Sequence, residues 1–290
     1  MLVSIAVLTI LILFVTRLLD HATNVISLGS KRMDAESTVR PLFDRMALDF
    51  ANMVKRPDVS YYLKTSATSM PGNDRLAFFS GIPGYYDDNG RSYNSRFSVV
   101  SYRVNTDPNS ASFNRIERMG KGLALNATYT DLMPILFLDS TVPTNNTTTL
   151  DALWPSATRA SPDPNYYSSD TYSQYEIIGS QAFRLEYYYL TSGGSPTLTG
   201  FPTDWTSVDT IAIKDISAIV VAVAIIDPQS NRLLSSTQIS TLAASLPDFN
   251  TGTPGSLLAS WQAILNNTAN MPRPGLSGIR LYERYFYLSQ

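Results

Sequence analysis

The sequence opens on MLVSIAVLTILILFVT, residues 1–16, an apolar run that only one serine and two threonines interrupt before the first charge at Arg17. As a helix this run rises about 24 Å, whereas the hydrocarbon core of a bilayer is about 30 Å thick. A signal-peptide core is shorter and ends in a small-residue cleavage motif, which is not seen before Arg17. We therefore expect residues 1–16 to form a transmembrane anchor that lies in lipid or among similar helices. The side chains expected to carry anchoring and assembly are Leu2, Ile5, Leu8, Ile12 and Phe14.

Residues 17–56 continue the helical pattern as an amphipathic segment, and Pro57 supplies a stop. The apolar positions are spaced by alternating fours and threes, at Val39, Phe43, Met46, Phe50 and Met53. The opposite, polar face is expected to carry Lys31, Arg32, Asp34, Glu36, Asp44, Arg45 and Asp49. Pro41 lies inside the pattern, and because it lacks an N–H and its ring clashes with the preceding turn, we expect a bend near Arg40 or a split helix.

The composition excludes several classes of function. With a net charge of -2 and a pI of about 5.4, the chain as a whole has no field that would attract nucleic acid. With no cysteine it has no disulfide, thiolate metal site or cysteine nucleophile. At 290 residues and 44% hydrophobic content it is long and apolar enough to bury a core.

Residues 57–290 are expected to form a β-rich globular head, because the pattern changes from helical to alternating after Pro57. A polar loop insertion is expected around residues 126–173, where Thr, Ser, Asn and Pro dominate. The apolar core of residues 215–227 is too short for a second membrane span and predicts a buried central strand. The expected strands are residues 75–80, 96–105, 111–119, 175–179, 181–190, 215–227 and 279–288, with helices at 236–244 and 256–267. The second and third strands are expected to form an antiparallel pair.

Two groups of residues could in principle carry chemistry. The only histidine, His21, lies one turn beyond the apolar run, where partners from the head could hardly reach it. Asp87, Asp88 and Asn89 offer the oxygen ligands that calcium prefers, yet Asp-Asp-Asn-Gly is first of all a turn sequence. These three residues are therefore only weak calcium candidates, and the sequence indicates no cofactor.

Two further features have plain structural interpretations. Glu176 and Glu186 could suggest a glycosidase pair, but two strands that are broken at residues 179–180 fix no geometry between them, so we expect exposed strand residues. Tyrosines gather at residues 166–167, 187–189 and 282–287. Aromatic strips can bind sugars or proteins, but packing within a sheet is the favoured interpretation.

The run MLVSIAVLTILILFVTRLLD, residues 1–20, resembles the N-terminal helix of the type IV pilin and type II secretion pseudopilin superfamily. DAESTVRPLFDRMALDFANMV, residues 34–54, and the segments RLAFFS, FSVVSYRVN and FRLEYYYL are similar to parts of J-type minor pseudopilins. The closest likeness is to a verrucomicrobial group of pilin-like proteins catalogued as "cassette protein C". In the superfamily a basic leader, a cleavage-site Gly and Phe-Thr-Leu-x-Glu precede the apolar helix. This sequence begins at what would be the sixth mature position, so we expect either a true start upstream or an anchored relative that is not processed.

The resemblance implies an α+β, pilin-like fold in which a long N-terminal helix packs on an antiparallel β-sheet head. It implies a structural or assembly subunit of a type IV pilus or type II secretion system, and no enzyme. The implied partners are other pilin-like subunits, the inner-membrane assembly platform, membrane lipid and, if the true start is upstream, a prepilin peptidase. The implied location is the bacterial inner membrane, crossed once, with the head in the periplasm or outside the cell. The alternative is a signal-anchored surface-binding protein that recognises polysaccharide or a partner protein.

Overall fold

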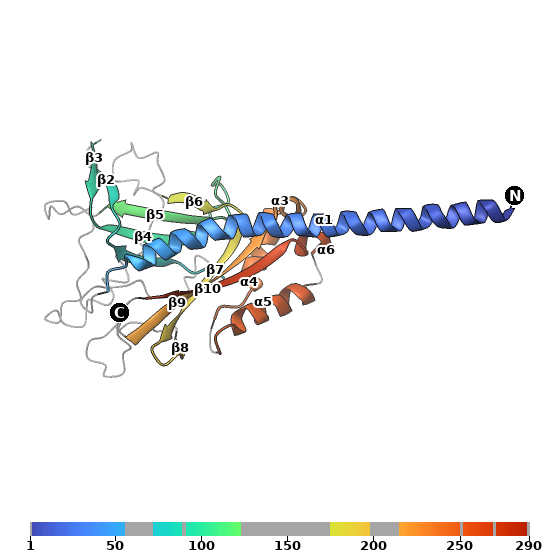
Figure 1. Ribbon diagram of the computed structural model, residues 1–290. Coiled ribbons are helices and arrows are strands. Elements are labelled where there is room, and N and C mark those ends of the chain that lie inside the picture. Colours follow the sequence, from blue (N-terminus) through green and yellow to red (C-terminus); the bar gives the residue numbers. More distant parts are fainter. Residues whose placement is uncertain are drawn as a thin grey trace.

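The structure is a computed structural model that describes residues 2–55, 72–88, 91–122, 175–197, 215–249, 252–268 and 271–288. One long helix, several short helices and two sheets of mainly antiparallel strands confirm the α+β class (Figure 1). The expected loop insertion at residues 126–173 lies outside the described residues. The helices are α1 (Leu2–Ala51), α3 (Pro228–Asn231), α4 (Ser236–Ser245), α5 (Ser256–Asn267) and α6 (Arg273–Leu276).

The first sheet has six strands in the order β1-β4-β5-β2-β3, with β6 also paired to β5. Its pairings are antiparallel except for one parallel contact between β2 and β5. Its strands are β1 (Leu76–Ser80), β2 (Gly84–Asp88), β3 (Arg91–Ser95), β4 (Ser98–Val104), β5 (Ile116–Gly122) and β6 (Tyr175–Gly179). The antiparallel pairing of β4 with β5 confirms the pair predicted from the sequence.

The second sheet has the order β10-β9-β7-β8 and is antiparallel throughout. Its strands are β7 (Ala182–Thr191), β8 (Pro196–Thr197), β9 (Ile216–Ile226) and β10 (Ile279–Tyr287). Strand β9 is buried between β10 and β7, as predicted for the apolar stretch in residues 215–227. Both predicted short helices, α4 and α5, are present after it.

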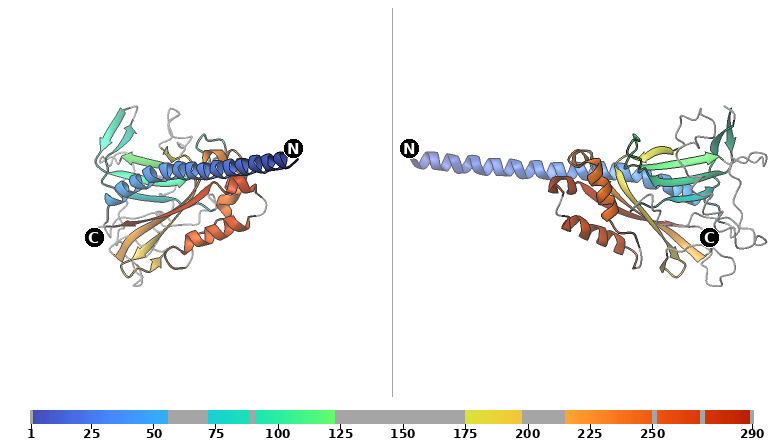
Figure 2. Two further views of the ribbon diagram at one scale, coloured as in Figure 1. Left: turned by 45° about the vertical axis from the view of Figure 1, so that its right-hand side comes forward. Right: turned by 180° about the vertical axis from the view of Figure 1, so that it is seen from behind.

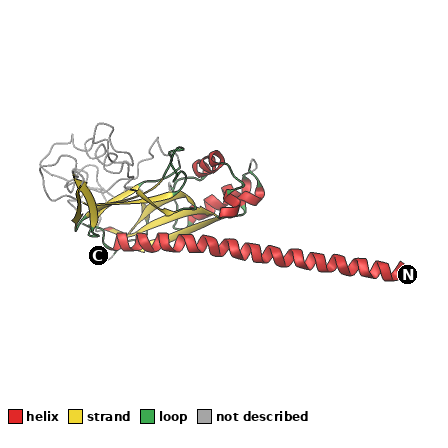
Figure 3. Ribbon diagram, turned by 90° about the horizontal axis from the view of Figure 1, so that it is seen from above, coloured by secondary structure: helices red, strands yellow, loops and turns green. Residues whose placement is uncertain are grey.

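Helix α1 has 50 residues and is therefore about 75 Å long. Its C-terminal half lies along the body formed by the sheets and short helices, and its N-terminal half projects from one end of that body (Figures 1 and 2). The prediction of a bend or split at Pro41 is wrong, because α1 runs through Pro41 as one helix and curves only gently (Figure 3). Pro41 leaves the carbonyl of Ser37 without its helical N–H partner, and both residues are exposed on the helix surface, while packing of Leu42 and Phe43 holds the helix in place.

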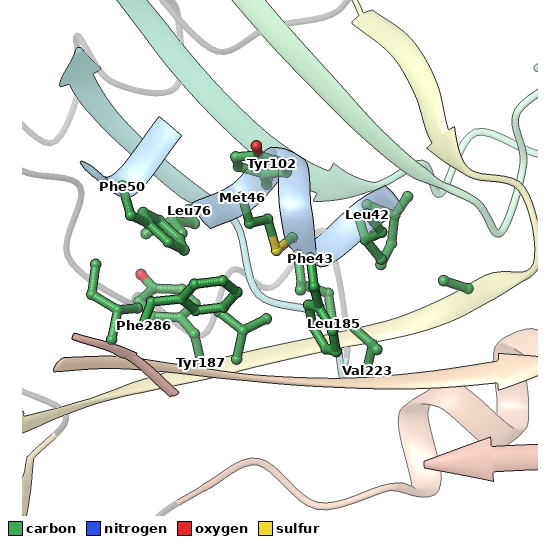
Figure 4. Close-up of a cluster of buried hydrophobic side chains, with 14 of the residues drawn as sticks. Leu42, Phe43, Met46, Phe50, Leu76, Tyr102, Leu185, Tyr187, Val223 and Phe286 are labelled. Atoms are coloured by element: carbon green, nitrogen blue, oxygen red, sulfur yellow. The ribbon is translucent and has the colours of Figure 1, made fainter. Parts of the chain in front are cut away.

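Two apolar clusters lie on the two faces of the second sheet, and side chains of β9 alternate between them. Ile219, Val221 and Val223 belong to the cluster that includes the C-terminal half of α1 and residues of the first sheet (Figure 4). Val220 and Ala222 belong to the other cluster, which includes α4 and α5. The second sheet is therefore covered on both faces.

Two stretches of the first sheet differ from the sequence-based expectation. Strands β2 and β3, which pair as an antiparallel hairpin, were not predicted from the sequence. Strand β5 begins at Ile116 instead of residue 111. Asn105 Nδ2 donates to Ser112 Oγ at 2.8 Å and to Glu117 Oε1 at 3.0 Å. These bonds hold the intervening chain as a loop, with Asn114 at a positive φ of 56°.

Candidate functional site

The projecting half of α1 carries a stretch of large, exposed apolar side chains (Figure 1). In residues 7–19, here called the apolar segment, ten such side chains are between 45% and 70% exposed. They are Val7, Leu8, Ile10, Leu11, Ile12, Leu13, Phe14, Val15, Leu18 and Leu19. Soluble surfaces rarely expose so many apolar side chains together, so the segment marks a site for interaction with lipid or protein.

The exposed side chains lie on every face of the helix, because successive residues of a helix point about 100° apart and the apolar segment is almost unbroken. Removing one such side chain from water contributes roughly 1.5–3 kcal/mol. Ten of them would contribute on the order of 15–30 kcal/mol before the costs of association are subtracted. The segment therefore favours surroundings that are apolar on all sides.

Three of the five predicted anchor residues lie in the apolar segment and have described side chains. Leu8, Ile12 and Phe14 are exposed on the projecting helix. Leu2 and Ile5 lie in α1, but their side chains are outside the described residues. Over the part of the chain that the structure describes, no helix is found with both the length and the apolar character needed to cross a membrane.

The C-terminal half of α1 has one buried face and one exposed face. Of the predicted stripe, Val39, Phe43, Met46 and Phe50 are buried on α1. The helix ends at Ala51 and not at residue 56 as predicted, so Met53, also buried, lies beyond it and forms a β-bridge with Ser80. The ring centroid of Phe50 lies 5.2 Å from that of Phe78 and 5.0 Å from that of Phe286 (Figure 4). Phe78 belongs to the first sheet and Phe286 to the second. This half of the helix is thus held between β1 and β10 by aromatic contacts.

Asp49, expected on the polar face, is completely buried, which corrects the sequence-based prediction. It accepts hydrogen bonds from Arg118 Nε at 2.6 Å and Nη2 at 2.9 Å, and from the hydroxyl of Tyr102. Burial, the negative charge of Asp49 and this hydrogen bond raise the pKa of Tyr102. Burial of Arg118 opposes its charge, but its bonds to Asp49 outweigh that effect and raise its pKa.

The burial of Asp49 could be predicted from the helical period, but its hydrogen-bond partners could not. Asp49 follows Leu42 by seven residues and Met46 by three, which is the spacing of the buried face. A carboxylate at such a position must be paired, since an isolated buried charge is very costly. The pairing with Arg118 joins residues 69 positions apart, and no local pattern predicts that.

Lys31 marks the point at which α1 leaves the body. Its Nζ donates to Ser230 Oγ at 3.3 Å and lies 3.8 Å from Oδ2 of the buried Asp227. The other carboxylate oxygen of Asp227 accepts from the backbone N–H groups of Gln229 and Ser230, and so caps α3. The sequence analysis predicted neither this contact nor its location.

The residues that the sequence suggested for catalysis or calcium binding form no common site among the described residues. His21 is exposed on the projecting helix. Asp87 and Asp88 lie in β2, but their side chains and all of Asn89 are outside the described residues, so the calcium prediction stays a prediction. In the described residues no cluster of His, Cys, Asp or Glu has the arrangement of a metal site.

The two glutamates lie in different sheets and do not form a catalytic pair. Glu176 of β6 is exposed and forms an ion pair with Arg118 at 3.4 Å. Glu186 of β7, expected to be exposed, is completely buried, because α4, α5 and the loop between them cover that face of the second sheet. It pairs with Arg184 at 3.2 Å and accepts from Phe249 N at 2.8 Å.

The tyrosines of β7 favour packing over ligand binding. Tyr187, Tyr188 and Tyr189 are at most 1% exposed, and the ring of Tyr188 stacks on Phe249 with centroids 4.0 Å apart. Buried rings cannot offer a face to a sugar, so these three tyrosines give no support to the surface-binding alternative. In the predicted group at residues 282–287, Tyr287 is 77% exposed, and Tyr166 and Tyr167 lie outside the described residues.

Comparison with known proteins adds no family assignment: no protein-family model matches the chain, and no curated protein sequence matches it.

Proposed function

We propose that this chain is a structural subunit of the pilin-like class, a minor pilin or minor pseudopilin that is held in its assembly by the apolar segment of α1. The single observation that carries this proposal is the exposure of ten large apolar side chains on all faces of the projecting helix. A helix of this kind is stable only where its whole circumference meets lipid or other apolar helices.

The division of α1 into two halves supports the same function. The projecting half is free to enter the apolar layer or to pack among helices of neighbouring subunits. The other half is fixed to the body by Phe50, by the Asp49–Arg118 ion pair and by Lys31. Because α1 is one continuous helix of about 75 Å, it would hold the head at a fixed distance and orientation from the anchored end.

Charge substitution in the apolar segment tests the proposal. Leu8→Asp or Ile12→Asp places a carboxylate in the apolar layer, which costs roughly 2.5–3.5 kcal/mol. We expect the amount of protein retained in native membranes after a high-salt wash to fall on the order of a hundredfold. Ser30→Asp, at an exposed position beyond the segment, is the matched control and should be retained as wild type. If Leu8→Asp and Ile12→Asp are retained equally well, the proposal is wrong.

Mass spectrometry of the N-terminal peptide from native membranes separates the pilin-like class from a plain anchor. A processed and N-methylated terminus would support a pilin-like subunit that is cut by a prepilin peptidase. A terminus at unprocessed Met1 would support a plain anchor.

A further inference from the structure

A groove of about 650 Å³ lies between α5, α6 and the start of β10. Its buried lining is apolar and includes Leu265, Leu276 and Ile279. Its more exposed lining is polar and includes Arg273 and Arg280. The groove therefore combines an apolar floor with two cationic side chains at its rim. None of the contacts described above involves these two side chains.

Both guanidinium groups are oriented by backbone carbonyls. Arg273 Nη1 donates to Asn266 O at 3.1 Å, and Arg280 Nη1 donates to Ser277 O and Ile279 O, both at 2.8 Å. Among the ion pairs of the described residues, none involves Arg273 or Arg280. Their positive charges are held in place without a described carboxylate, so they complement an anion.

The surrounding sequence is unusually poor in acid. Residues 249–282 contain these two arginines and no aspartate or glutamate, although acidic residues outnumber basic ones in the whole chain, 24 to 22. Residues 228–248 add Arg232 and one acid, Asp248. Residues 228–282 therefore contain three arginines and one aspartate, a formal charge of +2, even though the net charge of the chain is -2.

The groove lies at the end of the body from which α1 projects. Figures 1, 2 and 3 show the short helices gathered at this end, on the side toward the N-terminus of α1. If the projecting half of α1 enters the membrane, this end of the body faces the membrane surface. An anion with an apolar part next to it is then what the groove would meet.

We propose that this groove binds the headgroup of an anionic phospholipid, with Arg273 and Arg280 on the phosphate; because Leu19 and Lys31 are about 18 Å apart along α1, the helix must tilt so that this side of the body leans on the bilayer. This inference rests on the proposed function, because it requires the membrane to lie at this end of the body. Bound in this way, the lipid fixes how the body leans on the bilayer.

The test uses the full chain with Gln262→Cys, whose single thiol is unique because the chain has no cysteine. Gln262 is exposed and lines the groove, so it can carry an environment-sensitive fluorophore. The labelled protein is reconstituted into vesicles of phosphatidylcholine, or of phosphatidylcholine and phosphatidylglycerol in equal amounts. We expect a blue shift and a several-fold gain in fluorescence with phosphatidylglycerol only.

The double substitution Arg273→Gln and Arg280→Gln should abolish the gain that depends on phosphatidylglycerol. Arg232→Gln is the control, because it removes an exposed arginine near the same end of the body but outside the groove, and it should keep the gain. The inference is overturned if the fluorescence responds equally to both vesicles, or if the double variant responds as wild type does.

Flotation of the same samples separates the two proposals. Protein that floats with vesicles but shows no response to phosphatidylglycerol overturns the lipid groove and leaves the anchoring function standing. Protein that does not float with either vesicle overturns the anchoring function, and the groove's assignment fails with it.

Discussion

The two halves of helix α1 follow different rules, although they form one continuous helix. In the apolar segment, residues 7–19, large apolar side chains occur on all faces and stay exposed. In residues 31–51 apolar residues recur at helical spacing, and one face is buried against both sheets. Within α1, apolar residues at helical spacing therefore pack against the same chain, whereas the side chains of the unbroken apolar run stay exposed.

The largest difference between the halves should be in stability. Phe50→Ala removes a ring that is 1% exposed and packs between both sheets, so we expect a loss of about 4 kcal/mol in the free energy of unfolding. Leu11→Ala, in the apolar segment, should change that free energy by less than about 0.5 kcal/mol. Denaturant titration of the full chain in detergent measures both. Equal losses would show that the projecting half also packs against the body.

The buried ion pair gives a second comparison, within the packed half. Asp49→Asn leaves the buried Arg118 with the largely exposed Glu176 as its charged partner, and we expect a loss of about 3 kcal/mol. Asp44→Asn is the matched control, because the pair of Asp44 with Arg284 is about half exposed on both sides and contributes less than about 1 kcal/mol. The same denaturant titration applies. A loss at Asp49 no larger than that at Asp44 would contradict the structural role given to Asp49.

Pro41 should give a smaller effect of opposite sign. Proline inside a helix costs up to about 3 kcal/mol relative to alanine, and part of this is offset because proline restricts the unfolded chain. We therefore expect Pro41→Ala to stabilise the protein by about 2 kcal/mol. Arg40→Ala, also exposed, should change stability by less than about 0.5 kcal/mol. Destabilisation by Pro41→Ala would mean that the helix needs the proline at this position.

The pH dependence should show the smallest effect. Burial and the charge of Asp49 raise the pKa of Tyr102, so the folded protein keeps a proton that the unfolded chain loses near pH 10. The stabilisation is complete below that pH and is lost as the pH rises further, at up to about 1.4 kcal/mol per pH unit. Tyr102→Phe should reduce this slope of stability against pH, and Tyr287→Phe, an exposed control, should not. An unchanged slope in Tyr102→Phe would exclude Tyr102 as its source.

Much of the fold could be predicted because its signals are local. Helix α5 has the predicted bounds and follows Gly255, which adopts the left-handed conformation. Helix α4 begins after the capping box of Ser235 and Gln238. Strand β9 ends at Asp227 and Pro228, where an apolar run meets a helix start. In each case the residues that set the boundary are neighbours in the sequence.

The parts that could not be predicted depend on distant contacts. The alternating pattern of its strand predicts that Glu186 is exposed. It is buried because the loop after α4 covers it, and Phe249 N of that loop donates a hydrogen bond to it. Lys31 reads as part of a polar face, but it contacts Ser230 and Asp227, about 200 positions away. At the candidate site, the apolar segment and the buried stripe of α1 were predicted from the sequence, whereas the contacts of Asp49 and Lys31 that fix α1 to the body were not.

The measurement that tests the central claim most directly is thiol labelling along α1 in native membranes. The chain has no cysteine, so Leu8→Cys, Leu13→Cys and Ser30→Cys each carry a unique thiol. If the apolar segment is surrounded by lipid or neighbouring helices, a water-soluble maleimide should label Leu8→Cys and Leu13→Cys many times more slowly than Ser30→Cys, and detergent unfolding should remove the difference. Equal labelling rates at all three positions in native membranes would contradict the account.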